Sequence, residues 1–147
     1  MSYKSIEGSR IGLRSAGNLS TGGLLNITQP CVDASIAVAA ESTNVRAITI
    51  QLKDANGADI AYVETVEILV FTTAAMTAFA STGGSTGIAI GTDGALLPVV
   101  AKKYFIATSE SDGDIDLTWT DTGTESVAVG VRLPNGRVVI SDAFANT

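Results

Sequence analysis

Residues 112–143 read DGDIDLTWTDTGTESVAVGVRLPNGRVVISDA, and this stretch decides the fold class. Apolar side chains alternate with polar or small ones over 115–119 and again over 127–133. Such period-two alternation places one set of side chains on one face of a sheet. The Pro-Asn-Gly sequence at 134–136 is a strong hairpin signal before the apolar run at 138–140. We expect one antiparallel sheet here, with a buried face and a solvent-exposed face.

Further strand-like runs precede this stretch, each short and bounded by turn residues such as Asn56 and Gly57. Turn signals recur about every 8–12 residues and no helical segments alternate with the strands, which argues against a βαβ arrangement. We therefore predict an all-β fold, an antiparallel β-sandwich of the Ig-like or jelly-roll-like kind with about eight to ten short strands. The expected upstream strands are 31–38, 45–53, 60–62, 64–71, 88–90, 95–100 and 104–108.

Three details refine this prediction. Pro98 cannot donate a backbone hydrogen bond, so its strand is expected at a sheet edge or a bulge. Leu69 and Phe71 fall out of phase with the inward-facing residues of their strand, so we expect their face to be covered as well. Residues 72–87 lack strand periodicity and are expected to form a loop or a single helical turn that covers the core.

Composition and charge limit the classes of function. The chain has 147 residues, which suits one ordinary domain, and its low aromatic content of 5% implies a core of Val, Ile, Leu and Ala. A net charge of −6 disfavours nucleic acid as a partner, because phosphate binding needs a basic surface. Arg132 and Arg137 flank the hairpin turn and are expected to pair with acids on a neighbouring strand or subunit.

The single cysteine, Cys31, excludes an internal disulfide. We expect it to act as a small apolar side chain in a reducing compartment, with an intermolecular bridge as the alternative. No apolar run reaches the ~18 residues of a membrane helix, and the N-terminus lacks the apolar stretch of a signal peptide. The sequence therefore predicts a soluble protein made in the cytoplasm, without a membrane partner, unless another route exports it.

Residues 1–30 differ from the rest and are predicted to form an extended N-terminal arm before a sandwich domain at 31–147. The arm holds three bases and one acid, for a charge of +2, whereas the body holds six bases and fourteen acids, for a charge of −8. Two interpretations stay open: an unattached terminus, or an arm that orders on a neighbouring subunit. The candidate binding residues of the second interpretation are Ile6, Arg10, Ile11, Leu13, Arg14, Leu24, Leu25 and Ile27.

Four acids within 110–116 are the best candidates for a cation site, because Ca²⁺ binds through several oxygen ligands. The calcium loop of an EF-hand needs Gly at its sixth position and Glu at its twelfth. Counted from Asp112, these positions hold Leu117 and Gly123, so the pattern fails. Two of the acids also fall on the outward face of the predicted strand, where acids are simply solvated. We expect no metal site.

Catalytic patterns are missing from the sequence. The chain contains no histidine, which excludes Ser-His-Asp and Cys-His sites and any His-ligated zinc. One cysteine cannot build a thiolate zinc site, and no phosphate-binding glycine loop of the Walker or dinucleotide type occurs. Trp119 shares the phase of its apolar neighbours, so we expect a core role rather than ligand stacking. The sequence predicts no enzyme and no cofactor.

Four segments, taken in order, resemble a family of small β-rich virion proteins of tailed bacteriophages and prophages. They are IQLKDANGAD at 50–59, GIAIGTDG at 87–94, TSESDGDIDL at 108–117 and LPNG at 133–136. The likeness covers about two thirds of the chain, from 45 to 143, and leaves out the arm. Each motif alone is a turn or strand signal, and their order is more specific than any one of them.

The resemblance implies a structural part of a phage particle. We expect a capsid decoration, or cement, protein on the exterior of the virion head, made in the host cytoplasm, with the major capsid protein and copies of itself as partners. One alternative is a head-to-tail or tail-fibre-associated protein. Another is a particle-displayed adhesin or carbohydrate-binding module that recognises a host-surface glycan through the loops at 72–87 and 120–125.

Overall fold

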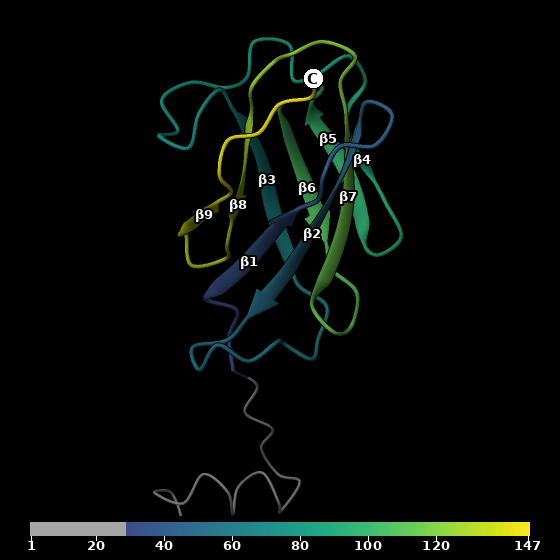
Figure 1. The fold of residues 1–147 in the computed structure, drawn as a ribbon. Helices are drawn as coiled ribbons and strands as arrows, with labels where there is room; N and C mark the ends of the chain where they lie inside the picture. Colours follow the sequence, from purple (N-terminus) through teal and green to yellow (C-terminus); the bar gives the residue numbers. More distant parts are fainter. Residues whose placement is uncertain (1–28) are drawn as a thin grey trace, which may run out of the picture.

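The computed structural model describes residues 29–147, which form a sandwich of two antiparallel sheets (Figure 1). The four-stranded sheet has the order β1-β2-β7-β4, and the five-stranded sheet has the order β5-β6-β3-β8-β9. This confirms the predicted all-β sandwich. The strands are β1 (Asp33–Val38), β2 (Val45–Lys53), β3 (Thr65–Phe71), β4 (Gly87–Ile90), β5 (Ala95–Val100), β6 (Tyr104–Thr108), β7 (Asp114–Thr120), β8 (Ala128–Arg132) and β9 (Val138–Ile140).

The core lies between the sheets and follows from period-two alternation. Each long strand turns every second side chain inward, so that rows from the two sheets meet. Trp119 is completely buried, as its phase predicted, and Cys31 is buried as well. Burial raises the pKa of the Cys31 thiol, in keeping with an apolar role for this side chain. The largest fully buried apolar side chains are Trp119, Ile48, Ile50, Leu52, Ile68, Ile115, Leu117, Val70, Val127, Val129 and Val131.

The prediction that 112–143 forms a single sheet is wrong. β7 belongs to the four-stranded sheet, whereas β8 and β9 belong to the five-stranded sheet, and residues 121–127 cross between them (Figure 1). Alternation shows which side chains face the core, but both sheets face the same core, so it cannot assign a strand to one of them. The hairpin itself is confirmed: Gly136 donates its backbone N–H to the carbonyl of Leu133 at 2.8 Å between β8 and β9.

The strand expected at 60–62 is absent from the structure, whereas the edge strand expected at Pro98 is present. Residues 60–62 do not form a strand; the chain there makes only a bridge between Lys53 and Asp59 before it leaves the sheet. Pro98 does lie in an edge strand, since β5 pairs only with β6, and the register shifts between Pro98 and Val100. A proline is tolerated there because its missing N–H faces solvent.

No helix in the described residues could cross a membrane. Segment 72–87 contains turns. The second half of this segment covers the core as predicted, since a Cβ atom on Gly84 would lie 2.9 Å from Trp119 Nε1, whereas its first half does not. Met76 and Phe79 remain about half exposed, and Phe79 returns to pair with Phe71 on the outer side of β3. Ala80 is the residue that turns into the core.

The last residues of the chain close one end of the sandwich. The Phe144 ring meets Trp119 edge to face at 5.3 Å between centroids. The Asn146 side chain is buried and donates to the backbone carbonyls of Asn44 at 2.7 Å and Asp121 at 2.8 Å. These contacts satisfy carbonyls at the strand ends, as buried polar groups require.

Candidate functional site

The eight arm residues singled out from the sequence lie outside the described residues. The structure does describe the point where the arm joins the body. Gln29 and Pro30 are exposed, and the Tyr62 hydroxyl donates a hydrogen bond to the carbonyl of Gln29 at 3.1 Å. The last two residues of the predicted arm thus lie on the surface of the body, next to the turn that precedes β3.

The outer faces of the two sheets differ sharply. On the four-stranded sheet the outward cross-strand pairs include Thr49 with Asp116 and Ala47 with Thr118, and no Leu, Ile, Phe, Met, Tyr or Trp points outward from its strands. We call this surface the polar face. The outer side of the five-stranded sheet is the apolar face, and it consists of Leu69, Phe71, Phe79, Leu97, Val100, Tyr104, Ile106, Val138 and Ile140.

Two rows of cross-strand neighbours organise the apolar face. Their residues are paired directly across adjacent strands, where side chains on one face contact one another. Leu97 is 61% exposed and Val100 is 51% exposed. The first row is Leu97, Ile106, Glu67, Arg132 and Val138, and the second is Val100, Tyr104, Leu69, Gly130 and Ile140.

Charge on the apolar face is confined to one ion pair. Arg132 Nη1 lies 3.1 Å from Glu67 Oε2, and the Tyr104 hydroxyl donates to Glu67 Oε1. The hydrogen bond to Glu67 raises the pKa of Tyr104. The partner of Arg132 is thus an acid on the neighbouring strand, one of the two alternatives predicted for it, while Arg137 pairs across the sandwich with Asp33 at 3.2 Å.

An aromatic stack covers one end of this face. The rings of Phe71 and Phe79 are parallel within 2° at a centroid distance of 5.5 Å. Phe71 is buried by this contact, while Phe79 remains 48% exposed. Gly130 lies beneath Phe71, where a Cβ atom would meet the Phe71 ring at 3.0 Å and Val138 at 3.2 Å. The expectation that the face of Leu69 and Phe71 is covered therefore holds for Phe71.

A shallow groove of about 370 Å³ crosses the apolar face near the β8–β9 hairpin. Its lining includes the Glu67–Arg132 pair, Ile106 and Pro134. The lining offers apolar contact with a single, internally neutralised ion pair, which suits a protein surface better than a charged small molecule.

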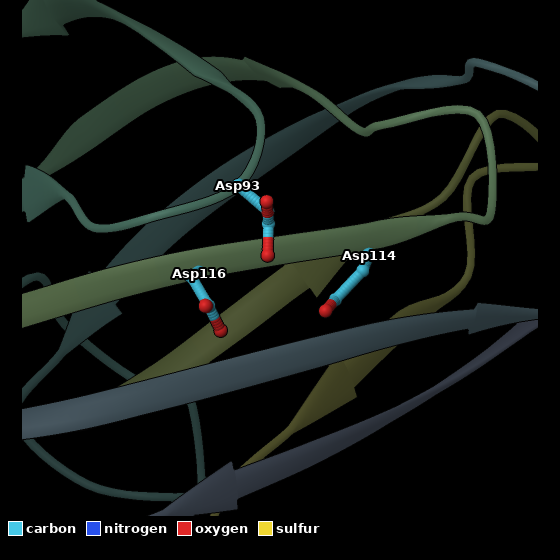
Figure 2. A group of neighbouring side chains, drawn as sticks. All are labelled: Asp93, Asp114 and Asp116. Carbon is cyan, nitrogen blue, oxygen red and sulfur yellow. The ribbon is translucent and has the colours of Figure 1, made fainter.

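Three carboxylates cluster on the polar face, and Figure 2 shows Asp114 and Asp116 on β7 with Asp93 beside them. Their ligand oxygens lie within 4.8 Å of one another. Burial, followed by the charge of Asp116, raises the pKa of Asp114, and one Asp114 oxygen is buried without a hydrogen-bond partner. Carboxylate oxygens are the ligands that hard cations prefer, but exposed acidic groups are common without an ion.

The cluster differs from the one expected from 110–116. Glu110 instead accepts a hydrogen bond from the backbone of Gly94 at 3.3 Å, and Asp112 accepts one from the backbone of Asp114. Asp93, which comes from the β4–β5 turn, takes their place. The β4–β7 pairing brings that turn to β7, so no spacing along the sequence could reveal it.

The two loops that were candidates for recognition meet at one end of the sandwich. The Glu125 carboxylate accepts hydrogen bonds from the backbone N–H groups of Thr82, Gly83 and Gly84, each at 2.9 Å, and from the Thr82 hydroxyl. Burial alone would raise the pKa of Glu125, but these hydrogen bonds outweigh it and lower the pKa to about 2. The ionised group therefore stabilises the fold above its ordinary pKa of 4.5, and this is lost as the pH falls towards 2.

No protein-family model matches the chain, and no curated protein matches it. Among solved structures it is similar to the cohesin module from a family 33 glycoside hydrolase of Clostridium perfringens. The identity is 13% and the TM-score is 0.40, over 82% of this chain and 95% of that chain. A likeness of that size carries no argument about function.

Sequence reasoning identified only the Leu69 and Phe71 part of the apolar face, although a further signal was present. Strand 104–108 contains three large apolar side chains in succession, at Tyr104, Phe105 and Ile106, and 138–140 is apolar throughout. Consecutive apolar residues in a strand place apolar groups on both of its faces. The strictly alternating strand at 114–120 has no such run, and its outer face is polar.

Proposed function

We propose that this protein is a structural virion protein of a tailed phage, a decoration protein on the exterior of the head. One observation carries the proposal: a +2 arm with scattered large apolar residues is joined to a −8 β-sandwich, in a chain whose motif order resembles small phage virion proteins. The arm binds the major capsid protein, and the body stays outside the shell.

The physical properties of the two parts support this division. An acidic body is kept from the encapsidated DNA, because both carry negative charge. An arm with scattered large apolar residues and three bases is suited to add to a sheet edge or fill a groove on a neighbour. Many copies on one shell make weak individual contacts effective through multivalency.

The test is binding of the full-length protein to purified heads that lack it. We expect saturable, stoichiometric binding, and we expect the arm variant Leu24→Asp/Leu25→Asp to lose it. The matched control Ser20→Asp/Thr21→Asp adds the same charge to the arm but keeps its apolar residues, and it should bind. Normal binding by the Leu24→Asp/Leu25→Asp variant, or by a chain that lacks residues 1–28, would refute the role of the arm.

A second candidate is a glycan-binding module displayed on the particle, and one contact favours it. Glu125 ties the loop at 120–125 to the loop at 82–84, so both predicted recognition loops form one surface. Thr122 and Thr124 are exposed on that surface. Selective binding on a glycan array, lost in Thr122→Ala/Thr124→Ala but kept in the arm variant, would favour this function. A particle image with the density assigned would separate a head position from a tail position.

A further inference from the structure

We infer that the apolar face is a self-association surface, on which a second copy of this chain packs its own apolar face by a two-fold contact. The inference goes beyond the proposed function, which concerns the contact between the arm and the capsid. It does not depend on the arm or on the capsid. The face is the outer side of the β5-β6-β3-β8-β9 sheet (Figure 1).

The first argument is the uneven distribution of apolar side chains. Antiparallel sandwiches normally keep their outer faces polar, as the four-stranded sheet does here. The five-stranded sheet instead exposes Leu97, Val100 and Phe79, each about half exposed or more, around the partly exposed Leu69 and Ile106. A continuous patch of this kind marks a protein contact surface.

The second argument is charge, and it selects a copy of the same chain as the partner. In a two-fold contact a face meets itself, so any net charge on it would repel its own copy. The strands of the apolar face carry only Glu67 and Arg132, which neutralise each other at 3.1 Å. The outward side chains of the four-stranded sheet include three acids, Asp33, Asp114 and Asp116, and one base, Lys53, for a net charge of −2. A strongly charged partner would find no unpaired charge to recognise on the apolar face.

The third argument concerns the edges of the five-stranded sheet, whose strands are poorly suited to edge-to-edge pairing with a second copy. A second copy could pair edge to edge with an exposed strand. In β5, however, Pro98 lacks an N–H and the register shifts before Val100. At the opposite edge, β9 is only three residues long and lies against β1. Neither edge of the five-stranded sheet therefore favours pairing with a second copy, which leaves the apolar face between these edges as the better surface of this sheet.

The size of the face sets the expected strength. Strands about 4.8 Å apart and about five residues long give a surface of roughly 24 Å by 17 Å, or on the order of 400 Å² in projection. Standard interfaces use about 800 Å² per partner, so we expect a weak dimer with a dissociation constant on the order of 100 µM. Such a contact suits copies that a shell holds at high local concentration.

The experiment is sedimentation velocity of the full-length protein from about 5 to 500 µM, concentrations that bracket that dissociation constant. Wild type is expected to move from the 15.0 kDa monomer towards a dimer. Leu97→Lys should weaken dimerisation at least about tenfold, because it places like charges in an apolar contact. Ala89→Lys is the matched control: it adds the same charge to an exposed edge-strand position on the polar face and should dimerise like wild type.

Both variants reduce the negative net charge, so general repulsion cannot explain a loss in Leu97→Lys alone. A wild-type protein that stays monomeric at 500 µM, or equal dimerisation by the two lysine variants, would overturn the inference. Loss of association in Leu24→Asp/Leu25→Asp would show that the arm occupies the contact, and would also overturn it. Failure of the wild-type protein to bind heads, together with normal dimerisation, would refute the capsid role only. Circular dichroism confirms that each variant is folded.

Discussion

On the four-stranded sheet the outward neighbours are pairs such as Thr49 with Asp116, whereas on the five-stranded sheet they are pairs such as Leu97 with Ile106. The inner faces of both sheets are mainly apolar and supply the buried core. The difference on the outside is therefore not needed for the core. The outer face of the four-stranded sheet is thus suited to contact with solvent, whereas the outer face of the five-stranded sheet has apolar area that stays partly exposed in the monomer.

The largest effect should follow from removing the aromatic cover of the apolar face. Phe71→Ala is expected to lower the free energy of unfolding by about 3 kcal/mol, because it deletes a buried ring and its stack with Phe79. Ser35→Ala, on the polar face, should change it by less than about 0.5 kcal/mol. Urea denaturation measures both. Similar losses in the free energy of unfolding for the two substitutions would mean that the two faces do not differ in packing.

A smaller effect should follow from adding a methyl group beneath the same ring. Gly130→Ala would place a Cβ 3.0 Å from Phe71 and 3.2 Å from Val138, and should destabilise the fold by about 1–2 kcal/mol. The same substitution in a Phe71→Ala background should cost less, because the ring that it meets is gone. Additive effects in this double-mutant cycle would contradict the packing described here.

The polar face should respond to pH through Asp114. Its pKa is raised in the folded state, so its ionised form destabilises the fold, and this penalty disappears as the pH falls through the raised pKa towards the ordinary value of 3.8. Asp114→Asn is expected to raise the free energy of unfolding by about 0.5 kcal/mol at pH 7, and by less at acid pH.

Thermal melts of Asp114→Asn at pH 7 and pH 3.5 test this effect, with the exposed Asp142→Asn as the control that should not change stability. Equal melting temperatures for Asp114→Asn and wild type at pH 7 would contradict it. A rise in the melting temperature of the wild type with Ca²⁺, absent in Asp114→Asn, would instead show that the cluster with Asp93 and Asp116 binds a cation.

The smallest effect should be that of salt on dimerisation. The full chain carries −6, but the apolar face has no net charge, so salt screens repulsion between the bodies without weakening the contact. Raising NaCl from about 20 to 200 mM should strengthen dimerisation about twofold, as measured by sedimentation. Dimerisation that weakens with salt would indicate a contact between the basic arm and an acidic surface. The apolar face would then no longer differ from the polar face as the dimer contact.

Much of the fold could be predicted from the sequence, because alternation reports directly on burial. The strand at 45–53 has the bounds that were expected, and Ile48, Ile50 and Leu52 point inward as their phase required. The proline of β5 marked an edge strand because a missing N–H is a local property. The turn before β9 was equally local, since Asn135 and Gly136 suit its backbone conformation.

The candidate sites were less predictable, because each is assembled from distant segments. Asp93 reaches Asp114 only because β4 pairs with β7. Glu67 meets Arg132 only because β3 pairs with β8, and Asn146 closes the sandwich only once the strand ends are in place. The arm residues, such as Leu24 and Leu25, remain a prediction from composition alone.

The strand content of this protein and the side chains of its core follow from the order of its residues, because the two-residue period of a strand is visible in that order. The same order also sets the charge difference between arm and body. The placement of β7 and β8 in opposite sheets, and the joining of outward residues from five separate strands into one apolar face, depend on how the strands pair in three dimensions. The physical reason is that strand pairing joins residues distant in the chain, and a local period contains no information about the partner strand.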